Sequence, residues 1–473
     1  MLRYILYILL VLVAVILGRA LVMPSKESTY VAQADDRALP YAEKLSEMIR
    51  CETVTDTSAE GLKKFDAFHK KLEDLFPAVH NTLERTVIDG NLLYRWKGES
   101  SEKPVVLMSH QDVVPAEGEW SHEPFGGEIS DGKVWGRGAI DTKSSQFAIF
   151  QAVDELVSEG YVPANDVYIS SSCTEEINGD GCPALVAYLK EKGVKPFMVC
   201  DEGGGIINEP VGGIHGNFAM VGIFEKGKAD IKLTARSSGG HASAPPKNTP
   251  IARLAAFMNE FETKSPFKKS IGSDVRAMFV ALAPYAPFYM KLLFGNFGFF
   301  SPLLKSVLPA VSAQAGAMLK TTIAFTMMKG SDACNVLPQE ASVCANMRFI
   351  PHQGMDESLA IVKKYADKYG LEMEVFPNAN DYTEPVDING EAYRLFTRAI
   401  EETFPELPHS PYVMTGATDS HYYSEICPDC LRFAPVIMGP EQMKGMHGID
   451  ENVEYSCLPK AVDFYKKLIE LNK

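Results

Sequence analysis

The sequence predicts an α/β protein with a doubly wound, mostly parallel sheet and an inserted, smaller α+β domain. Short apolar runs alternate with helical patterns from Tyr41 to about Phe197, and such patterns return after Tyr382. Near Lys226 the character changes to strands and helices in an order that suits a small α+β sandwich. At 473 residues the chain exceeds what one hydrophobic core usually organises, so two domains are expected.

The first half supplies strands and helices in turn. "KPVVLMS" predicts a buried strand ending at Ser109, and "DVYISSS" and "KPFMVCDEGGG" predict two more, the last leading into glycines. "CPALVAYLKEKG" predicts a helix closed by Gly193, and "DTKSSQFAIFQAVDELVSEG" predicts an amphipathic helix followed by Gly160. The apolar face of that second helix consists of Phe147, Phe150, Val153 and Leu156.

The middle of the chain predicts the inserted domain. "KADIKLTARSSGGHASAPP" is typical of a solvent-facing strand, with apolar residues at Ile231 and Leu233, followed by a turn. "IARLAAFMNEFET" and "MDESLAIVKKYADKYG" predict helices, and "ASVCANMRFIP" and "LEMEVFP" predict strands. "LRFAPVIMG" then predicts a strand of the first domain and "CLPKAVDFYKKLIELNK" its last helix. We therefore expect an N-terminal segment at 1–23 and a larger domain in two parts, 40–226 and 378–473. The insert lies between these parts, at 227–377.

Two segments are unusually apolar. Leu2 to Met23 is almost unbroken hydrocarbon apart from Arg3 and Arg19, and it fits a signal peptide and a membrane anchor equally well. Either interpretation places the bulk of the chain outside the cytoplasm. Residues 278–313 carry only two charges, and we expect them to form helices packed on the insert's own sheet. The alternative is an apolar patch that receives a hydrophobic substrate or touches lipid.

Composition excludes some classes of function. The net charge of −15 argues against nucleic acid as a partner, because phosphate binding needs a basic surface. Nine scattered cysteines give no legible disulfide framework. The lone "CPDC" at 427–430 is expected to be incidental rather than a zinc or redox site, since it has no second pair.

Residues that bind metals gather where predicted strands and loops end. Such crevices at the carboxyl ends of strands bind ligands in open α/β sheets. Two histidines with several carboxylates suit zinc, and their number exceeds what one tetrahedral ion needs, which favours two ions. The candidates are His110, Asp112, Asp141, Glu175, Glu176, Asp201, Glu202 and His447.

Glu175 and Glu176 are adjacent in "YISSSCTEEINGDG", just after a predicted strand. Neighbouring carboxylates repel one another unless a cation or a shared proton separates them. A solvated loop would explain the pair trivially. A metal site in which the two neighbours do different work would explain it functionally.

Five motifs in order, "SHQDVVP", "GRGAIDTK", "TEEINGDG", "DEGGG" and "GGHAS", resemble the di-zinc metallopeptidase family of aminoacylase, carboxypeptidase S, acetylornithine deacetylase and succinyl-diaminopimelate desuccinylase. The similarity covers nearly all the chain after about Tyr41 and is nearest to the branch of carboxypeptidase S and the N-fatty-acyl-amino-acid hydrolases/synthases. It implies a zinc-peptidase-like catalytic domain with a ferredoxin-like lid and dimerisation domain, and hence a homodimer.

The resemblance also implies roles for the candidate residues. His110 and Asp201 would bind one zinc ion and Glu176 and His447 the other, with Asp141 bridging the two; cobalt or manganese could substitute. Glu175 would be the general base, and Asp112 would orient His110 through its far ring nitrogen.

Residues of the insert would complete the site. His241 of "GGHAS" would reach the active site of the partner subunit, and Asn335 and Arg348 would hold the substrate's carboxylate. One departure is visible at His421, where relatives commonly have arginine.

The expected function is zinc-dependent hydrolysis of an amide bond next to a free carboxylate, in a small peptide or an N-acyl amino acid. The alternatives are a dipeptidase or a biosynthetic deacylase of narrow specificity and, outside the enzymes, an inactive membrane-tethered binding protein.

Overall fold

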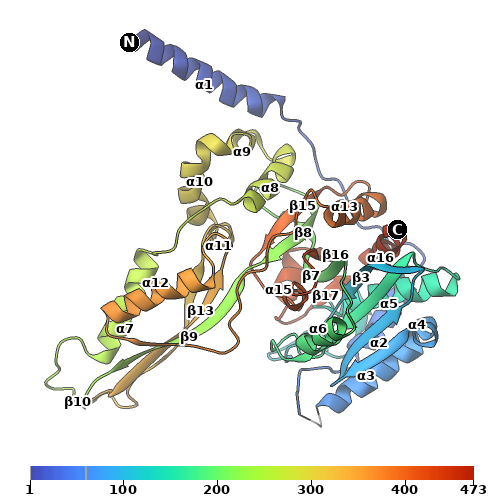
Figure 1. Cartoon of the computed structure of the whole chain (residues 1–473), viewed down its shortest axis with the longest axis horizontal. Helices are drawn as coiled ribbons and strands as arrows, with labels where there is room; N and C mark the ends of the chain where they lie inside the picture. Colours follow the sequence, from blue (N-terminus) through green and yellow to red (C-terminus); the bar gives the residue numbers. More distant parts are fainter. Residues whose placement is uncertain (1, 59–60) are drawn as a thin grey trace.

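The computed structural model describes residues 2–58 and 61–473 and contains a large and a small sheet (Figure 1). The large sheet has the strand order β1-β2-β6-β3-β7-β16-β8-β15. Parallel pairs join β3 to β6 and β7, β7 to β16, and β8 to β15, so the predicted fold class is confirmed. Its strands are β1 (Glu84–Ile88), β2 (Asn91–Trp96), β3 (Ser100–Met108), β6 (Asn165–Ser171), β7 (Met198–Asn208), β8 (Asn217–Glu225), β15 (His409–Met414) and β16 (Cys430–Met438).

Helices cover both faces of this sheet, because successive side chains of a strand point to opposite faces. In β3, Val105 and Leu107 join one apolar core, whereas Val106 and Met108 join another. The first core lies under α2 (Ala38–Ile49), α5 (Lys143–Ser158), α13 (Glu391–Thr403) and α16 (Leu458–Leu471), and the second under α6 (Gly181–Glu191) and α14 (Ser420–Tyr423).

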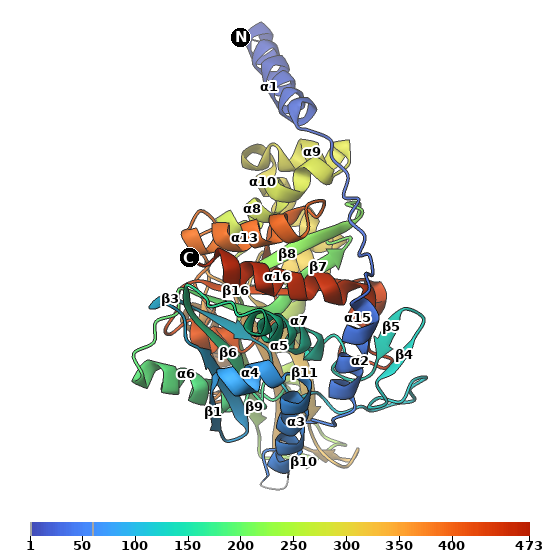
Figure 2. The ribbon, with the colours of Figure 1, turned by 90° about the vertical axis from the view of Figure 1, so that its right-hand side faces the viewer.

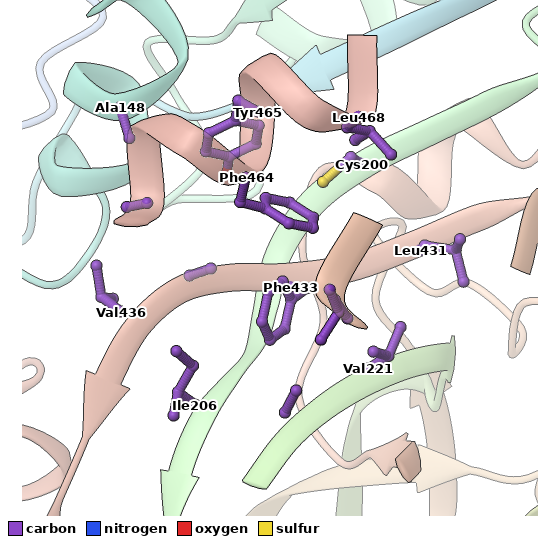
Figure 3. Close-up of a cluster of buried hydrophobic side chains, with 14 of the residues drawn as sticks. Ala148, Cys200, Ile206, Val221, Leu431, Phe433, Val436, Phe464, Tyr465 and Leu468 are labelled. Atoms are coloured by element: carbon purple, nitrogen blue, oxygen red, sulfur yellow. The ribbon is translucent and has the colours of Figure 1, made fainter. Parts of the chain in front are cut away.

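The contact between α16 and the sheet illustrates the first core (Figure 3). Phe464 of α16 lies over β16, and its ring meets that of Phe433 edge-on with centroids 5.3 Å apart. Helix α5 differs from the prediction: residues 143–153 are all buried rather than one face alone, because α2 and α16 also pack on it.

The small sheet has the order β11-β13-β9-β14, and all three of its strand pairings are antiparallel. Alternate residues of β9 are buried under α7 (Pro250–Thr263) and α12 (Met355–Lys368), which gives this sheet a separate apolar core. A short ribbon of β10 (Gly240–His241) and β12 (Val336–Leu337) lies at its far end (Figure 1). The strands are β9 (Gly227–Arg236), β11 (Thr322–Lys329), β13 (Glu340–Phe349) and β14 (Glu372–Val375).

The chain enters and leaves the small sheet at one point. Lys228 and Asn380 pair through two backbone hydrogen bonds, Lys228 N to Asn380 O at 2.9 Å and Asn380 N to Lys228 O at 2.8 Å. A Cβ atom on Gly227 would lie 2.5 Å from the carbonyl carbon of Asp381. Only glycine therefore allows the outgoing and returning segments to approach this closely.

The apolar segment after α7 packs differently from the prediction. It forms α8 (Ser273–Leu282), α9 (Phe288–Phe294), α10 (Phe297–Val311) and α11 (Ala313–Ala317). The expectation that these helices cover the insert's own sheet is wrong, because Met278, Phe279 and Phe294 belong to the core of the large sheet, where α8 covers edge strand β15.

Helix α1 (Leu2–Val22) projects from the body of the protein beyond α9 (Figure 2). Its segment Arg3–Val22, with a mean hydropathy of 2.8, is long and apolar enough to cross a membrane, a test that a signal sequence also passes. The remaining elements flank the large sheet: α3 (Leu62–Leu75), α4 (Pro77–Thr82), β4 (Glu128–Ser130), β5 (Lys133–Trp135), α15 (Pro440–Gly445), β17 (Asn452–Glu454) and the short turns η1 (Ala283–Tyr285) and η2 (Tyr455–Cys457).

Candidate metal centre

Three side chains meet at the carboxyl ends of the central strands. His110 follows β3, and its Nε2 atom lies 3.0 Å from Oδ1 of Asp141 and 3.3 Å from Oε1 of Glu202. One potential ligand atom from each of the three lies within 4.8 Å of the others, and all three are shielded from solvent. An imidazole facing two carboxylates at this spacing is a suitable donor set for zinc.

A second group shares Asp141 with the first. Nε2 of His447 lies 3.0 Å from the other carboxylate oxygen of Asp141, Oδ2, and 3.1 Å from Oε2 of Glu176. Asp141 therefore offers one oxygen to each group, which is the arrangement of a carboxylate that bridges two cations.

The donor atoms fit a bound cation. Oε1 of Glu176 is buried and has no hydrogen-bond partner among the described residues. Such an orphaned carboxylate oxygen is costly unless something that the chain does not supply compensates it. A metal ion held by these residues would supply that compensation.

Asp201, predicted as a ligand, is not brought to either group, and Glu202 takes the expected position. The two residues are consecutive in β7, so their side chains point to opposite faces. Oδ2 of Asp201 instead accepts a hydrogen bond from the backbone N–H of Ser420 at 2.8 Å, on the side of α14.

Asp112 connects His110 to the Glu175–Glu176 pair. Its Oδ1 and Oδ2 atoms accept the backbone N–H groups of Glu175 and Glu176 at 3.2 and 3.1 Å, respectively. The Nδ1 atom of His110 lies 2.9 Å from the backbone oxygen of Asp112 and 3.5 Å from its Oδ1. A proton on Nδ1 would leave Nε2 free to bind a metal, and the shorter contact of Nδ1 is with the backbone carbonyl group of Asp112 rather than with its carboxylate.

Burial raises the pKa of three acidic groups in and beside the cluster. It raises the pKa of Glu202 to about 8, with Asp141 adding to the effect. It raises the pKa of Asp419, a carboxylate not predicted from the sequence that accepts a hydrogen bond from Ser172, also to about 8. The pKa of Glu175 is raised well above its usual value by burial, against the attraction of His110. These shifts describe the cluster without cations, whose binding would favour the ionised carboxylates.

A buried ion pair between Arg137 and Glu451 fixes the backbone near both ligand groups. Oε1 of Glu451 accepts the backbone N–H groups of Ile140 and Asp141 at 2.9 and 3.0 Å, and its Oε2 accepts Nη1 of Arg137 at 2.5 Å. Arg137 also donates Nη2 to the carbonyl of Gly448 at 2.6 Å, next to His447. No local sequence signal joins residues this far apart, which is why the pair was not predicted.

Two of the predicted insert residues, His241 and Asn335, lie away from the cluster. His241 and Asn335 belong to the exposed ribbon at the far end of the small sheet, where the N–H of Ala242 donates to the carbonyl of Asn335 at 3.0 Å (Figure 1). Arg348 is half-buried in β13 and donates from Nε to Oδ1 of Asn346 at 3.1 Å. The structure thus does not bring His241 to the metal centre of its own chain.

His421 contacts the segment that returns from the small sheet. Its Nε2 atom lies 3.0 Å from Nδ2 of Asn380, and its Nδ1 lies 2.7 Å from the carbonyl of Thr418. His421 therefore joins α14, which packs on the large sheet, to the point where the two sheets connect.

Comparisons with known proteins agree with this geometry. The sequence profile of peptidase family M20/M25/M40 matches residues 106–471. The chain is 31% identical over 414 residues to a probable carboxypeptidase S-like 2 of Dictyostelium discoideum, covering 86% of this chain and 79% of that protein. It is 30% identical over 479 residues to the N-fatty-acyl-amino acid synthase/hydrolase PM20D1 of Xenopus tropicalis, covering 98% and 93%.

Solved structures share the fold at lower identity. An M20 family metallo-carboxypeptidase from Sulfolobus solfataricus superposes with a TM-score of 0.68 at 16% identity, covering 93% of this chain and 99% of that chain. Human carnosine dipeptidase 1 superposes with a TM-score of 0.63 at 14% identity, covering 92% and 96%.

Proposed function

The chain belongs to peptidase family M20/M25/M40, and from this premise we propose that it hydrolyses the amide bond of N-acyl amino acids or of peptides with a free carboxyl end. It is a metal-dependent amidohydrolase. The observation that carries the proposal is the pair of ligand groups that share Asp141, with Glu175 close enough for His110, Glu202 and Asp141 to affect its pKa.

Two zinc ions are proposed as cofactors, with cobalt or manganese as substitutes. His110, Asp141 and Glu202 would hold one ion, and Asp141, Glu176 and His447 the other. Bound zinc supplies a Lewis acid that can lower the pKa of a coordinated water to about 7 and polarise a carbonyl group.

Glu175 is proposed as the general base. Its backbone N–H is fixed by Asp112, and its neighbour Glu176 faces His447, so two adjacent carboxylates can serve different purposes. The Glu175 carboxylate would take a proton from the attacking water and pass it to the nitrogen of the leaving amine. This division of work explains why the two acidic residues stand side by side.

Residues 227–377 are proposed to form the lid and dimerisation domain, which has its own sheet and core. Arg348 would bind the substrate's carboxylate with two parallel hydrogen bonds, and Asn335 would assist it. His241 would stabilise the oxyanion of the partner subunit's substrate. Its exposed position at the far end of the small sheet favours action across a homodimer over action within one chain.

An apolar acyl group is the favoured substrate feature. The similarity to an N-fatty-acyl-amino acid synthase/hydrolase extends over 98% of this chain. Carboxypeptidase action is the second candidate, because the sequence identity to a carboxypeptidase S-like protein is as high as that to the N-fatty-acyl-amino acid synthase/hydrolase. Helix α1 would direct the chain to the extracytoplasmic side of a membrane.

The test is a panel of N-acyl amino acids and dipeptides, each with its carboxylate free or amidated, offered to the zinc-loaded protein. We expect turnover of the free-carboxylate substrates and a fall of roughly 10²–10⁴-fold in the Glu175→Ala variant. Metal content should stay unchanged in that variant. Equal turnover by the two proteins would exclude Glu175 as the base, and no turnover by the wild type would overturn the proposed function.

A further inference from the structure

The end of α1 is packed against the body of the protein. Most of its apolar side chains from Tyr4 to Leu10 are exposed, but Ile16 and Ala20 are only 9% and 2% exposed. The buried amide of Asn296, between α9 and α10, donates from Nδ2 to the carbonyl of Ile16 at 3.1 Å. The last turns of α1 therefore hold a fixed position beside α9.

The segment after α1 is also fixed. The buried ammonium of Lys291 in α9 donates to the carbonyl of Pro24 at 2.9 Å and lies 2.7 Å from Oγ of Ser25. Further along, Nδ2 of Asn217 donates to the carbonyl of Tyr30 at 3.0 Å. The segment after α1 is thus not a flexible linker, and α1 holds a fixed position relative to α9 and α10.

Helices α9 and α10 lie between α1 and the rest of the protein (Figure 2), and both expose large apolar side chains. In α10 the exposed residues Phe299, Leu303 and Val307 recur every four positions and so form one stripe. Phe288 and Tyr289, at the start of α9, are 49% and 63% exposed. The sequence from 278 to 313 contains no acidic residue, and one of its two lysines is the buried Lys291.

The position of the contact along α1 sets the depth of these side chains in a membrane that α1 would cross. Ile16 precedes the end of α1 at Val22 by six residues, which corresponds to about 9 Å along a helix axis. If α1 crosses a bilayer, Asn296 lies at a level where interfacial helices bury their apolar faces, about 5–10 Å into the boundary between headgroups and acyl chains.

We propose that α1 is retained as a membrane anchor and that the exposed apolar residues of α9 and α10 insert into the outer leaflet of the same bilayer. The occupant of this surface is lipid rather than a second protein chain. The inference is independent of the proposed reaction, because it uses none of the metal-site residues.

The experiment adds one tryptophan at a time to the full-length protein, which is reconstituted in phosphatidylcholine vesicles with or without bromine on the acyl chains. The test variants are Phe299→Trp and Leu303→Trp, and the matched control is Met327→Trp, at an exposed apolar position of β11 that is 68% exposed. The three native tryptophans give a background that the unsubstituted protein measures. Retained hydrolysis or, failing that, an unchanged circular dichroism spectrum shows that each variant is folded.

We expect brominated lipid to quench most of the added emission in the Phe299→Trp and Leu303→Trp variants and none in the Met327→Trp variant. Bromines near the headgroup end of the chain should quench more than bromines near the methyl end. Emission from both test variants that is no more quenched than the control would overturn the proposal. An emission that is blue-shifted but not quenched, and whose blue shift is lost when the protein is diluted in lipid, would show that a second copy of the chain covers the surface and would overturn the proposal.

Discussion

Arg137 and Glu451 form a buried ion pair in which Nη1 and Oε2 lie 2.5 Å apart, although 314 residues separate them in the sequence. Through its other oxygen Glu451 fixes the backbone of Asp141, and through its second nitrogen Arg137 fixes the loop of His447. The pair thus determines how closely the shared carboxylate and the exposed histidine approach one another.

Replacing Glu451 should therefore weaken metal binding without touching a ligand. In Glu451→Gln the side chain keeps its shape but loses its charge, and we expect metal affinity to fall about 10–100-fold. Glu451→Ala, which leaves Arg137 buried without a partner, should cost roughly 3–5 kcal/mol of stability. Zinc titration against a competing chelator and thermal unfolding measure the two effects. Glu73→Gln, at an exposed ion pair, should change neither.

The exchange of ligand roles in β7 gives a second prediction. Glu202→Ala should reduce the bound metal from two ions to one per chain, because it removes an atom of the first ligand group. Asp201→Asn should keep both ions, since its side chain faces Ser420. Elemental analysis of the purified variants decides between them, and the opposite pattern would restore Asp201 as the ligand.

Arg348 should act on substrate binding rather than on the chemical step. We expect Arg348→Met to raise KM for substrates with a free carboxylate by roughly 10–10²-fold and to leave kcat nearly unchanged, because a charge-assisted hydrogen bond contributes about 1.5–3 kcal/mol. The amidated substrate should be handled equally by the variant and the wild type. A fall in kcat alone would contradict this role.

The proposed action of His241 across a dimer can be tested by mixing two inactive proteins. His241→Ala and Glu175→Ala should each be nearly inactive, whereas a dimer assembled from one chain of each contains one site with both groups intact. Co-refolding or co-expression should therefore restore activity. If His241 acts within its own chain, the mixture stays inactive.

Lys226 predicts a pH dependence of stability. Burial lowers the pKa of its ammonium to about 7 from an ordinary 10.5, while its Nζ still donates to the carbonyls of Ala317 and Lys320. Between these two pH values the unfolded chain binds a proton that the folded chain has released, so this group's contribution to stability rises with pH by at most about 1.4 kcal/mol per unit.

The Lys226→Met variant has no ammonium group at this position, so neither its folded nor its unfolded chain binds this proton. The difference in Tm between wild type and variant should therefore widen in favour of the wild type as pH increases from 7 to 10. Lys264→Met, at an exposed position of the insert, serves as the control and should follow the wild type in parallel. A difference in Tm between wild type and Lys226→Met that stays constant or narrows as pH increases would contradict the lowered pKa of Lys226.

The sequence predicted that strands and helices alternate along the chain and that metal-binding residues follow the strands, because apolar periodicity and the residue types at strand ends are local signals. Both Asp201 and Glu202 were candidates, and the resemblance named Asp201 as the ligand, whereas the structure brings Glu202 to the metal centre. A shift of one residue reverses the direction of every side chain in a strand, and the phase of β7 depends on its neighbours β3 and β16.

The packing of α8–α10 was mispredicted for a different reason. The hydrophobic effect is not directional, so an apolar helix can pack on any uncovered apolar surface. The sequence does not show that the edge strand β15 is such a surface, because this depends on the assembled fold. The ion pair of Arg137 and Glu451 and the buried Asp419 were missed because their partners are distant in sequence.

The meeting of the two connections at Gly227 has an evolutionary consequence. Since residues 228 and 380 are hydrogen-bonded neighbours, the small sheet and its two helices could vary or be exchanged for another module while the larger sheet keeps its strand order, provided that α8 still covers edge strand β15. Recognition and association could in this way diversify separately from the chemistry.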